Sequence, residues 1–435
     1  MSQSYYVPDP IQGTIELPPW LVIIKDEPVI RRMMFIRQLG LKAYMDFPGA
    51  IHTRYSHALG TMCLAGKMSE MLSKKLGNKK GKQVIAKNLQ DNKNNIMAAG
   101  FLHDIAHAPF SHAADFVLRK ITGKSHEELC EDIIRTKIPS EIENWGITKS
   151  SVIQLIRSKT HGYPFLSQII NGPLDSDKLD YLLRDAYHVG LRYSFDLDHF
   201  LRSYTVLREE DELNHCLLGL DLTQQAIVTA ELFLVIWKSM YDLVYFVEQS
   251  RISEKMLEKA FLLCKDESSV RDMFQIDKYV EANDESMSEQ LKKMEPNIVQ
   301  FLAFENPKRL YSAELELELN KKKYKMKPGF YAELEDNPDE LSDQLSLRLA
   351  EELKQEKYSL ICDIVKSKAP REIYLDNANT KKQEIQLRTK SDIVGALTAR
   401  NMLKVYVGPT VLKNVNKKHM KEVLRALVEE ERGDD

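Results

Sequence analysis

One short segment, Gly100–His112, constrains what this chain can fold into more than any other feature. It reads GFLHDIAHAPFSH and closes an apolar stretch with a helical repeat. His103 and Asp104 are adjacent, and His107 follows one helical turn after His103, so the three side chains can point toward one ion or ligand. Because burying this many titratable groups without a shared ligand would be costly, the segment predicts a binding site.

The residues that follow extend the same cluster. Pro109 ends the helix, and Ser111 is positioned to cap a second helix whose first turn carries His112 and Asp115. The simpler alternative is a set of isolated surface or core histidines. That alternative suits a single histidine, but it does not suit a cluster of this density.

A second histidine segment, HTRYSH at residues 52–57, begins another predicted helix. It places Arg54 and two imidazoles, one of them His57, close to a helix N-terminus. Such a group can bind an anion or a metal ion together with residues from elsewhere in the chain.

A third segment, residues 175–185, reads DSDKLDYLLRD and predicts an amphipathic helix. Its leucines form the buried stripe, whereas Asp177, Tyr181 and Asp185 recur every four residues on a separate stripe. A solvated acidic face is the alternative interpretation. A tyrosine in line with two aspartates favours a pocket.

Imidazole nitrogen and carboxylate oxygen together are suitable ligands for Mn, Fe, Zn or Ni. A mixed set of four such ligands that leaves open positions suits a hydrolytic metal ion better than a closed structural site. We therefore expect one divalent transition metal ion at this cluster.

Composition excludes several other classes of protein. The 435 residues carry 61 Lys and Arg against 64 Asp and Glu, a net charge of -3, which excludes a globally basic nucleic-acid binder. The five cysteines are scattered and indicate reduced thiols. The sequence has neither a run of about 18 apolar residues nor a signal-peptide pattern, so we expect a cytoplasmic protein with no membrane segment.

The apolar periodicity predicts a mainly α protein. Residues 1–20 are rich in proline and predict an extended segment, and residues 204–207 with 215–220 predict a hairpin. The predicted helices lie at residues 29–39, 56–76, 95–106, 111–121, 126–136, 150–160, 176–188, 224–240 and 242–264. After residue 265 the charge density rises and short strands are predicted at 314–319, 372–375 and 402–407, with a helix at 389–401. We expect an all-helical core over 1–264 and a smaller α+β extension over 265–435.

The order H…HD…D resembles the HD-domain phosphohydrolase superfamily. Longer strings, HTRYSHALG, FLHDIAHAPFSHAAD, SHEEL and DSDKLDYLLRDAYHVG, resemble its deoxynucleoside triphosphate triphosphohydrolase branch, and the resemblance covers about residues 8–260. It implies an all-helical HD core and hydrolysis of a deoxynucleoside triphosphate (dNTP) to a deoxynucleoside and tripolyphosphate, with water attacking the α-phosphorus.

The resemblance also implies a role for individual residues. The metal ligands would be His57, His103, Asp104 and Asp177. The phosphate contacts would be made by Arg54, Lys178 and His107. Proton transfer near the leaving 5′ oxygen would involve His112, Asp115, His126 and Glu127. The 3′-hydroxyl would contact Gln38 and Asp185, and the 2′ position would be crowded by Leu39 and Tyr181. Mg²⁺ can accompany the triphosphate, and the family implies a homo-oligomer.

Two departures from the family pattern affect these expectations. A later helix of the family often carries a phosphate-binding arginine, and here that position is Trp237, followed by Lys238. Some members bind a guanine nucleotide effector between subunits through an Asp, an Arg and a Lys. Asp26 is present, but the other two positions look like Met34 and Tyr5, which argues against the same effector site.

Two other functions remain open at this point. One is HD-type hydrolysis of another nucleotide, such as a nucleoside monophosphate or a cyclic or alarmone nucleotide. The other is a regulatory nucleic-acid-binding protein with a vestigial HD site, for which the support is the lysine run at 321–327 and Lys417–His419. The complete set of predicted ligands and the sugar-contacting residues favour a dNTP hydrolase, with nucleic acid not expected as a partner.

Overall fold

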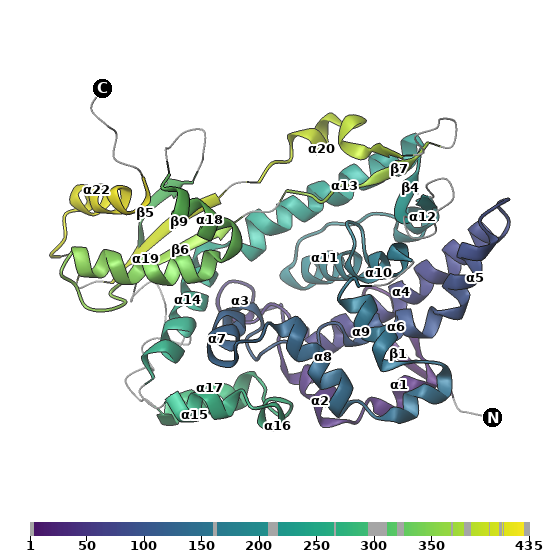
Figure 1. Cartoon of the computed structure of the whole chain (residues 1–435), viewed down its shortest axis with the longest axis horizontal. Coiled ribbons are helices and arrows are strands. Elements are labelled where there is room, and N and C mark those ends of the chain that lie inside the picture. The colour runs from purple at the N-terminus through teal and green to yellow at the C-terminus, as the bar shows by residue number, and fades with distance from the viewer. Residues whose placement is uncertain are drawn as a thin grey trace.

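The computed structural model describes residues 4–159, 163–207, 216–264, 267–294, 311–319, 326–366, 369–377, 384–399, 401–408, 411 and 413–429. Within these ranges the side chains of His112, Glu267, Met294, Pro328 and Glu384 are outside the description. Figure 1 shows a large helical body and, at the upper left, a smaller unit in which helices pack on a sheet. The fold is mainly α with a smaller α+β part, as predicted.

The chain begins with a hairpin. Strands β1 (Tyr5–Asp9) and β2 (Gly13–Leu17) pair antiparallel, and Gly13 supplies the positive φ of 76° that the turn requires. Asp9 accepts hydrogen bonds from the Ile11 and Gln12 amides and so closes the turn. The extended segment predicted for residues 1–20 is correct for the strands between Tyr5 and Leu17, whereas residues 1–3 lie outside the described part of the chain. Helix α1 (Pro19–Ile24) follows.

Helix α4 (Arg54–Gly77) is the central element of the helical body. Thr53 caps it in a reciprocal arrangement with Ser56, and two lysines in its last turn suit the negative end of the helix dipole. It packs against α5 (Gln83–Asp91), α6 (Lys93–Leu102) and α11 (Ser176–Val189). These contacts bring the three segments that carry the predicted site residues next to one another.

The other helices of this body enclose α4 and its neighbours. They are α2 (Pro28–Arg31), η1 (Arg32–Phe35), α3 (Lys42–Met45), α7 (His112–Thr122), α8 (His126–Lys137), η2 (Ser140–Trp145), α9 (Lys149–Ile156), α10 (Pro164–Asn171), α12 (Leu197–Ser203), α13 (Gln224–Met240), η4 (Tyr241–Tyr245), α14 (Glu248–Leu263), α15 (Glu267–Met273), α16 (Ile276–Tyr279) and α17 (Asp284–Met294).

Two predicted helix boundaries were wrong near the site. Helix α6 ends at Leu102, because the chain turns through residues 103–106 and then takes positive φ at Phe110 and Ser111. Ser111 precedes α7, but its hydroxyl does not cap that helix and instead donates to the Arg37 carbonyl. The helix predicted at 242–264 is divided, since a π-helical turn, η4, precedes α14.

The predicted hairpin is present as β3 (Tyr204–Leu207) and β4 (Leu217–Asp221), paired antiparallel. A later part of the chain extends it: β7 (Tyr374–Asp376) pairs parallel with β4, and β8 (Glu384–Gln386) pairs with β7. Leu375, Leu387 and Val394 belong to the large core, so this part of the chain returns to the helical body before β9. The boundary expected at residue 264 stays a prediction.

The smaller unit contains a three-stranded antiparallel sheet with its own core. Its strand order is β5 (Ser312–Glu318), β9 (Asn401–Val407), β6 (Leu360–Lys366). Helices α18 (Pro328–Asp336), α19 (Pro338–Glu352) and α22 (Lys417–Val428) complete it. The helix predicted at 389–401 was wrong in extent: only η7 (Leu387–Thr389) and α20 (Asp392–Ala396) form, and β9 begins at Asn401.

Among the residues described, no helix is both long enough and apolar enough to cross a membrane. The cytoplasmic location stays a prediction.

Candidate active site and metal centre

Three elements bring the four predicted metal ligands together. His57 lies in the first turns of α4, His103 and Asp104 follow α6, and Asp177 lies in the first turn of α11. His57 Nε2 is 3.0 Å from Asp177 Oδ1 and 3.7 Å from Asp104 Oδ2. His103 Nε2 is 3.3 Å from Asp104 Oδ1 and 3.5 Å from Asp177 Oδ1. One ligand atom from each of His57, His103 and Asp104 lies within 4.8 Å of the other two.

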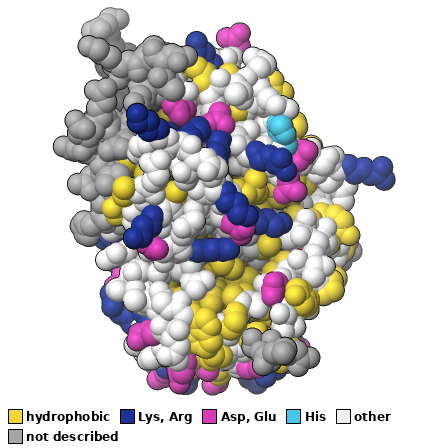
Figure 2. All heavy atoms as spheres, turned by 90° about the vertical axis from the view of Figure 1, so that its right-hand side faces the viewer, with side chains coloured by type: hydrophobic (Ala, Val, Ile, Leu, Met, Phe, Trp, Pro, Cys, Tyr) yellow, Lys and Arg dark blue, Asp and Glu magenta, His cyan; other side chains and the backbone are white. Residues whose placement is uncertain are grey.

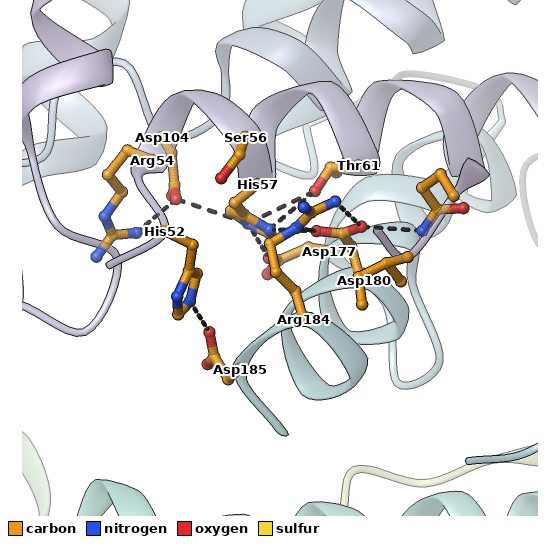
Figure 3. Close-up of polar contacts among 12 residues, drawn as sticks. His52, Arg54, Ser56, His57, Thr61, Asp104, Asp177, Asp180, Arg184 and Asp185 are labelled. Atoms are coloured by element: carbon orange, nitrogen blue, oxygen red, sulfur yellow. Dashed lines mark hydrogen bonds and ion pairs between the residues drawn. The ribbon is translucent and has the colours of Figure 1, made fainter. Parts of the chain in front are cut away.

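Both imidazoles are held so that Nε2 faces the shared space. The Nδ1 nitrogen of His103 is 2.9 Å from the Gly100 carbonyl, which places a proton on Nδ1 and leaves Nε2 as a lone-pair donor. Within the described ranges Nε2 has no hydrogen-bond partner. The Nδ1 nitrogen of His57 is 3.0 Å from Asp180 Oδ2. Support of the second ring nitrogen by a carbonyl or carboxylate is typical of histidines that bind metal ions. Figure 3 shows His57 with Asp104 on one side and Asp177 and Asp180 on the other.

The electrostatics of the cluster require positive charge at its centre. Burial lowers the His57 pKa, but hydrogen bonds to Asp177 and Asp180 outweigh burial and raise it to about 10. Burial raises the Asp177 pKa, but His103 and His57 outweigh it and hold that pKa below its usual value. The carboxylates around the imidazoles thus favour positive charge at this point, and a divalent cation can supply it in place of imidazole protons. The donor set and its charge fit one divalent metal ion.

A buried ion pair, Asp180 with Arg184, supports His57 and was not predicted from the sequence. Asp180 accepts from Arg184 Nε at 2.7 Å and from Gln12 Nε2 at 2.9 Å, and Arg184 also pairs with Asp9. Asp180 and Arg184 are fully buried, and α4 approaches them at Gly60. Asp180 and Arg184 are four residues apart and lie beside the apolar stripe of α11. This spacing is the sequence signal that indicates an ion pair within the helix.

The phosphate-contacting residues predicted from the resemblance lie around the cluster. Arg54 is buried, and its Nη1 is 2.5 Å from Asp104 Oδ2 while its Nε donates to Ser111 Oγ at 3.1 Å. The buried Nη2 of Arg54 has no hydrogen-bond partner among the residues that the structure describes. Lys178 donates to Asp175 Oδ2 at 2.6 Å and to the Gly172 carbonyl at 3.1 Å.

The predicted proton-transfer residues form a neighbouring group. His107 Nε2 is 3.2 Å from Asp104 Oδ1, and its ring stacks on His126 with centroids 4.7 Å apart. Asp115 lies 3.6 Å from His107 Nδ1 and 3.8 Å from His126 Nδ1. The His112 side chain lies outside the described part of the structure. Imidazoles beside a shared carboxylate can hold and transfer a proton near neutral pH.

Asp185 lies at the other side of the cluster with both carboxylate oxygens engaged. Oδ1 is 2.7 Å from His52 Nε2, and Oδ2 accepts from the Tyr245 hydroxyl at 2.7 Å. The His52 ring stacks on His188 at 4.3 Å. Burial and the neighbouring His52 lower the His188 pKa to about 4. His52 was expected from its sequence segment near the site, but its pairing with Asp185 was not predicted. Tyr245 was missed because it comes from a distant helical turn.

These groups surround one cavity of about 480 Å³, a volume suited to a nucleotide-sized ligand. The predicted residues that line it are Gln38, Leu39, Arg54, His103, Asp104, His107, His126, Glu127, Asp177, Lys178, Tyr181 and Asp185. His57 and Asp115 lie behind its wall. Aromatic residues of α13 and η4, among them Trp237 and Tyr241, complete the lining.

A helical body that brings H…HD…D together at the base of such a cavity defines the HD class of metal-dependent phosphohydrolases. The HD domain family model matches residues 54–213, and the model of the HD associated region matches residues 209–433, more than half of the chain. The chain belongs to this family, which confirms the resemblance found in the sequence.

Similar proteins include characterised and uncharacterised members. An uncharacterised protein of Methanocaldococcus jannaschii is 31% identical over 255 residues, which are 58% of this chain and 48% of that protein. The deoxynucleoside triphosphate triphosphohydrolase SAMHD1 of Homo sapiens is 32% identical over 243 residues, which are 48% of this chain and 37% of the human protein. The matched part thus spans less than half of the length of either relative. A hypothetical protein of Aquifex aeolicus shares the fold, with a TM-score of 0.70 at 23% identity, over 97% of this chain and 100% of that one.

Proposed function

We propose that this chain hydrolyses deoxynucleoside triphosphates to a deoxynucleoside and tripolyphosphate. The observation that carries the proposal is one cavity shared by three groups: the His and Asp cluster, the buried guanidinium of Arg54, and the Asp185 carboxylate. The first two suit a phosphoryl group, and the third suits a sugar hydroxyl. The printed name of the human relative supports the same substrate class.

His57, His103, Asp104 and Asp177 would hold one divalent transition metal ion, Mn, Fe, Zn or Ni, and Mg²⁺ would accompany the triphosphate. When bound, the metal ion supplies Lewis-acid polarisation of a phosphoryl oxygen and lowers the pKa of water.

Arg54 is the residue of this chain best placed to bind the α-phosphate. Its Nη1 and Nε are held by Asp104 and Ser111, so the guanidinium plane is fixed, and its unpartnered Nη2 is available to a phosphate oxygen. His107 contacts the same carboxylate, Asp104, that holds Arg54, and it would donate to a second phosphate oxygen. A fixed cation at the reacting phosphate stabilises the charge that develops during transfer.

Proton delivery to the departing 5′ oxygen would come from the stacked pair His107 and His126, with Asp115 near both. His112 and Glu127 belong to the same proposal, since Glu127 lines the cavity beside His126. A group that protonates the leaving oxygen makes scission of the bond between it and the α-phosphorus easier.

Asp185 would accept a hydrogen bond from the 3′-hydroxyl. Each carboxylate oxygen has two lone pairs, so the bonds from His52 and Tyr245 leave capacity for a third partner. Gln38 lies on the same cavity, and Tyr181 and Leu39 would occupy the space that a 2′-hydroxyl requires. These four residues would give the preference for a deoxyribose.

The alternatives differ in substrate rather than in site. Hydrolysis of another nucleotide would use the same metal ligands without needing the Asp185 group. The hypothesis of a nucleic-acid-binding protein depends partly on the lysine run at 321–327, of which residues 321–325 lie outside the described residues. On the face drawn in Figure 2, Lys and Arg side chains are interspersed with Asp and Glu and form no continuous basic surface. We also propose a homo-oligomer that does not use a guanine effector, because Met34 and Tyr5 replace the charged contacts.

The test is product analysis by ion-exchange chromatography. The metal-loaded protein would be incubated with the four dNTPs, singly and mixed, with the His103→Ala, Asp104→Ala double variant as control. We expect deoxynucleoside plus tripolyphosphate from the wild type, and loss of both metal content and turnover in the variant. Release of inorganic phosphate or pyrophosphate instead would contradict cleavage at the α-phosphorus, and turnover in the variant would contradict the site.

A further inference from the structure

The cavity is lined by five lysine and arginine side chains, and they differ in how their charge is balanced. The five are Lys42, Arg54, Lys178, Arg251 and Arg371. Four have a carboxylate partner: Lys42 pairs with Glu254, Arg54 with Asp104, Lys178 with Asp175 and Arg251 with Asp363. The first four charges are therefore largely neutralised before any ligand arrives.

Arg371 differs from them. Its Nη1 donates to the neutral Asn171 Oδ1 at 3.1 Å, and within the described part of the chain no ion pair joins it to a carboxylate. The adjacent Glu372 instead lies 3.7 Å from Arg388. An exposed guanidinium at a cavity, with a neutral partner, is available for bidentate contact with a phosphate.

The position of Arg371 is set by the sheet that follows it. Pro370 and Ile373, on either side, are buried, and the Ile373 carbonyl accepts from the Leu387 amide at 2.8 Å. Strand β7 pairs with β4, and a Cβ at Gly219 would come within 2.7 Å of the Tyr374 carbonyl, so this close approach requires glycine. In Figure 1 β7 lies beside β4 and α13, on the helical body. A residue from the last quarter of the chain thus reaches the cavity from a fixed support.

Two neighbours indicate which part of a substrate Arg371 would meet. Arg371 donates to Asn171, and Lys178 donates to the carbonyl of the adjacent residue Gly172, so the two cations contact neighbouring residues of the chain and line the same cavity. Lys178 follows the predicted metal ligand Asp177, whereas Arg371 is an exposed residue of the cavity lining. Helix α13 provides no cation here, since Trp237 lines the cavity and Lys238 pairs with Asp242.

We propose that Arg371 binds the outer phosphates of the triphosphate, completing from the C-terminal region a phosphate site that begins at Arg54 and Lys178. The inference rests on the proposed function for the identity of the nucleotide, but it specifies a polyphosphate as the group recognised. Removing such a contact weakens ground state and transition state alike, so KM rises while kcat changes little.

The experiment measures binding of inorganic tripolyphosphate to the Mn²⁺-loaded protein by calorimetry. We expect Arg371→Gln to weaken binding about tenfold or more, since a charge-assisted hydrogen bond is lost. Arg371→Lys should retain part of the affinity. Arg388→Gln is the same change at an arginine of η7 that does not line the cavity, and it should leave the affinity for tripolyphosphate unchanged. With dNTP as substrate, Arg371→Gln should raise KM by a similar factor.

The outcomes separate this inference from the proposed function. Failure of the wild type to bind tripolyphosphate, or equal affinity of the wild type and Arg371→Gln, would overturn the role of Arg371. Tripolyphosphate binding that depends on Arg371, together with no turnover of any dNTP, would support the phosphate site and refute the dNTP hydrolase.

Discussion

The His57 imidazole lies between two carboxylates, with Nδ1 3.0 Å from Asp180 and Nε2 3.0 Å from Asp177. The two carboxylates have different surroundings: Asp177 faces the cavity, whereas Asp180 is fully buried and neutralised by Arg184. One carboxylate is therefore available as a ligand, and the other holds the ring. This arrangement links the predicted metal centre to the packing of α11 on α4.

Asp180→Asn should weaken metal binding by about 10- to 100-fold, as loss of a supporting carboxylate does at other metal sites. The amide no longer accepts as strongly from His57 Nδ1, so the ring is less fixed and less basic. Metal content after dialysis against graded chelator measures the change. The control is Asp9→Asn, which also loses an Arg184 contact but does not touch His57. Equal metal loss in both variants would refute a specific role for Asp180.

Gly60→Ala should lower the free energy of unfolding by more than about 2 kcal/mol, because its Cβ would lie 1.9 Å from Asp180 Oδ1 and 2.4 Å from Arg184 Nη2. Both groups are buried, so relief of the overlap breaks their ion pair. Urea unfolding measures the loss. Gly329→Ala, where a Cβ meets nothing within 4 Å, is the control and should be near neutral. A stability loss below about 1 kcal/mol for Gly60→Ala would mean that α4 and α11 can move apart at little cost in free energy.

The sequence predicted the helical body and the residues around the cavity because their signals are local. Helical periodicity identified α11, and the HD pair lies in one turn. It did not predict β6, since LICDIVK is buried on both faces and lacks a regular alternation of apolar and polar residues, and a buried helix can have the same composition. Nor did it pair His52 and Tyr245 with Asp185, or find Arg371. Their relation to Asp185 and Lys178 depends on tertiary packing across distant segments, which no spacing in the chain encodes.

Tyr245→Phe should reduce the preference for deoxy over ribo substrates. The ring stays, but Asp185 loses the hydroxyl that donates to Oδ2, so the carboxylate is free to turn. We expect kcat/KM for a dNTP to fall about fivefold to tenfold, in line with one lost hydrogen bond to a charged group, with metal content unchanged. Asp185→Ala should give a larger fall. A parallel decrease for ribonucleotides would refute a role in sugar recognition.

Asp343 should make the protein less stable in acid. It lies on α19 and accepts from Lys259 of α14, Lys120 of α7 and the Tyr358 hydroxyl, at 2.8, 2.8 and 2.9 Å, so it joins the smaller unit to the helical body. Burial raises its pKa, but Lys259 and Lys120 outweigh burial and lower it to about 2. The unfolded carboxyl, with a pKa of about 3.9, therefore binds a proton more readily than the folded one.

The contribution of this carboxylate is full above about pH 4 and is lost as the pH falls toward 2. Asp343→Asn should cost about 3 kcal/mol at pH 6, because the buried Lys259 loses one of its two carboxylate partners, Asp343 and Glu258. The difference from wild type should shrink at pH 3. Urea unfolding at both pH values measures it. Glu340→Gln is the control, since Glu340 is exposed and 3.7 Å from Lys120, and should change stability by less than about 0.5 kcal/mol. A difference that stays constant between pH 6 and pH 3 would show that the Asp343 carboxylate is not ionised in the fold.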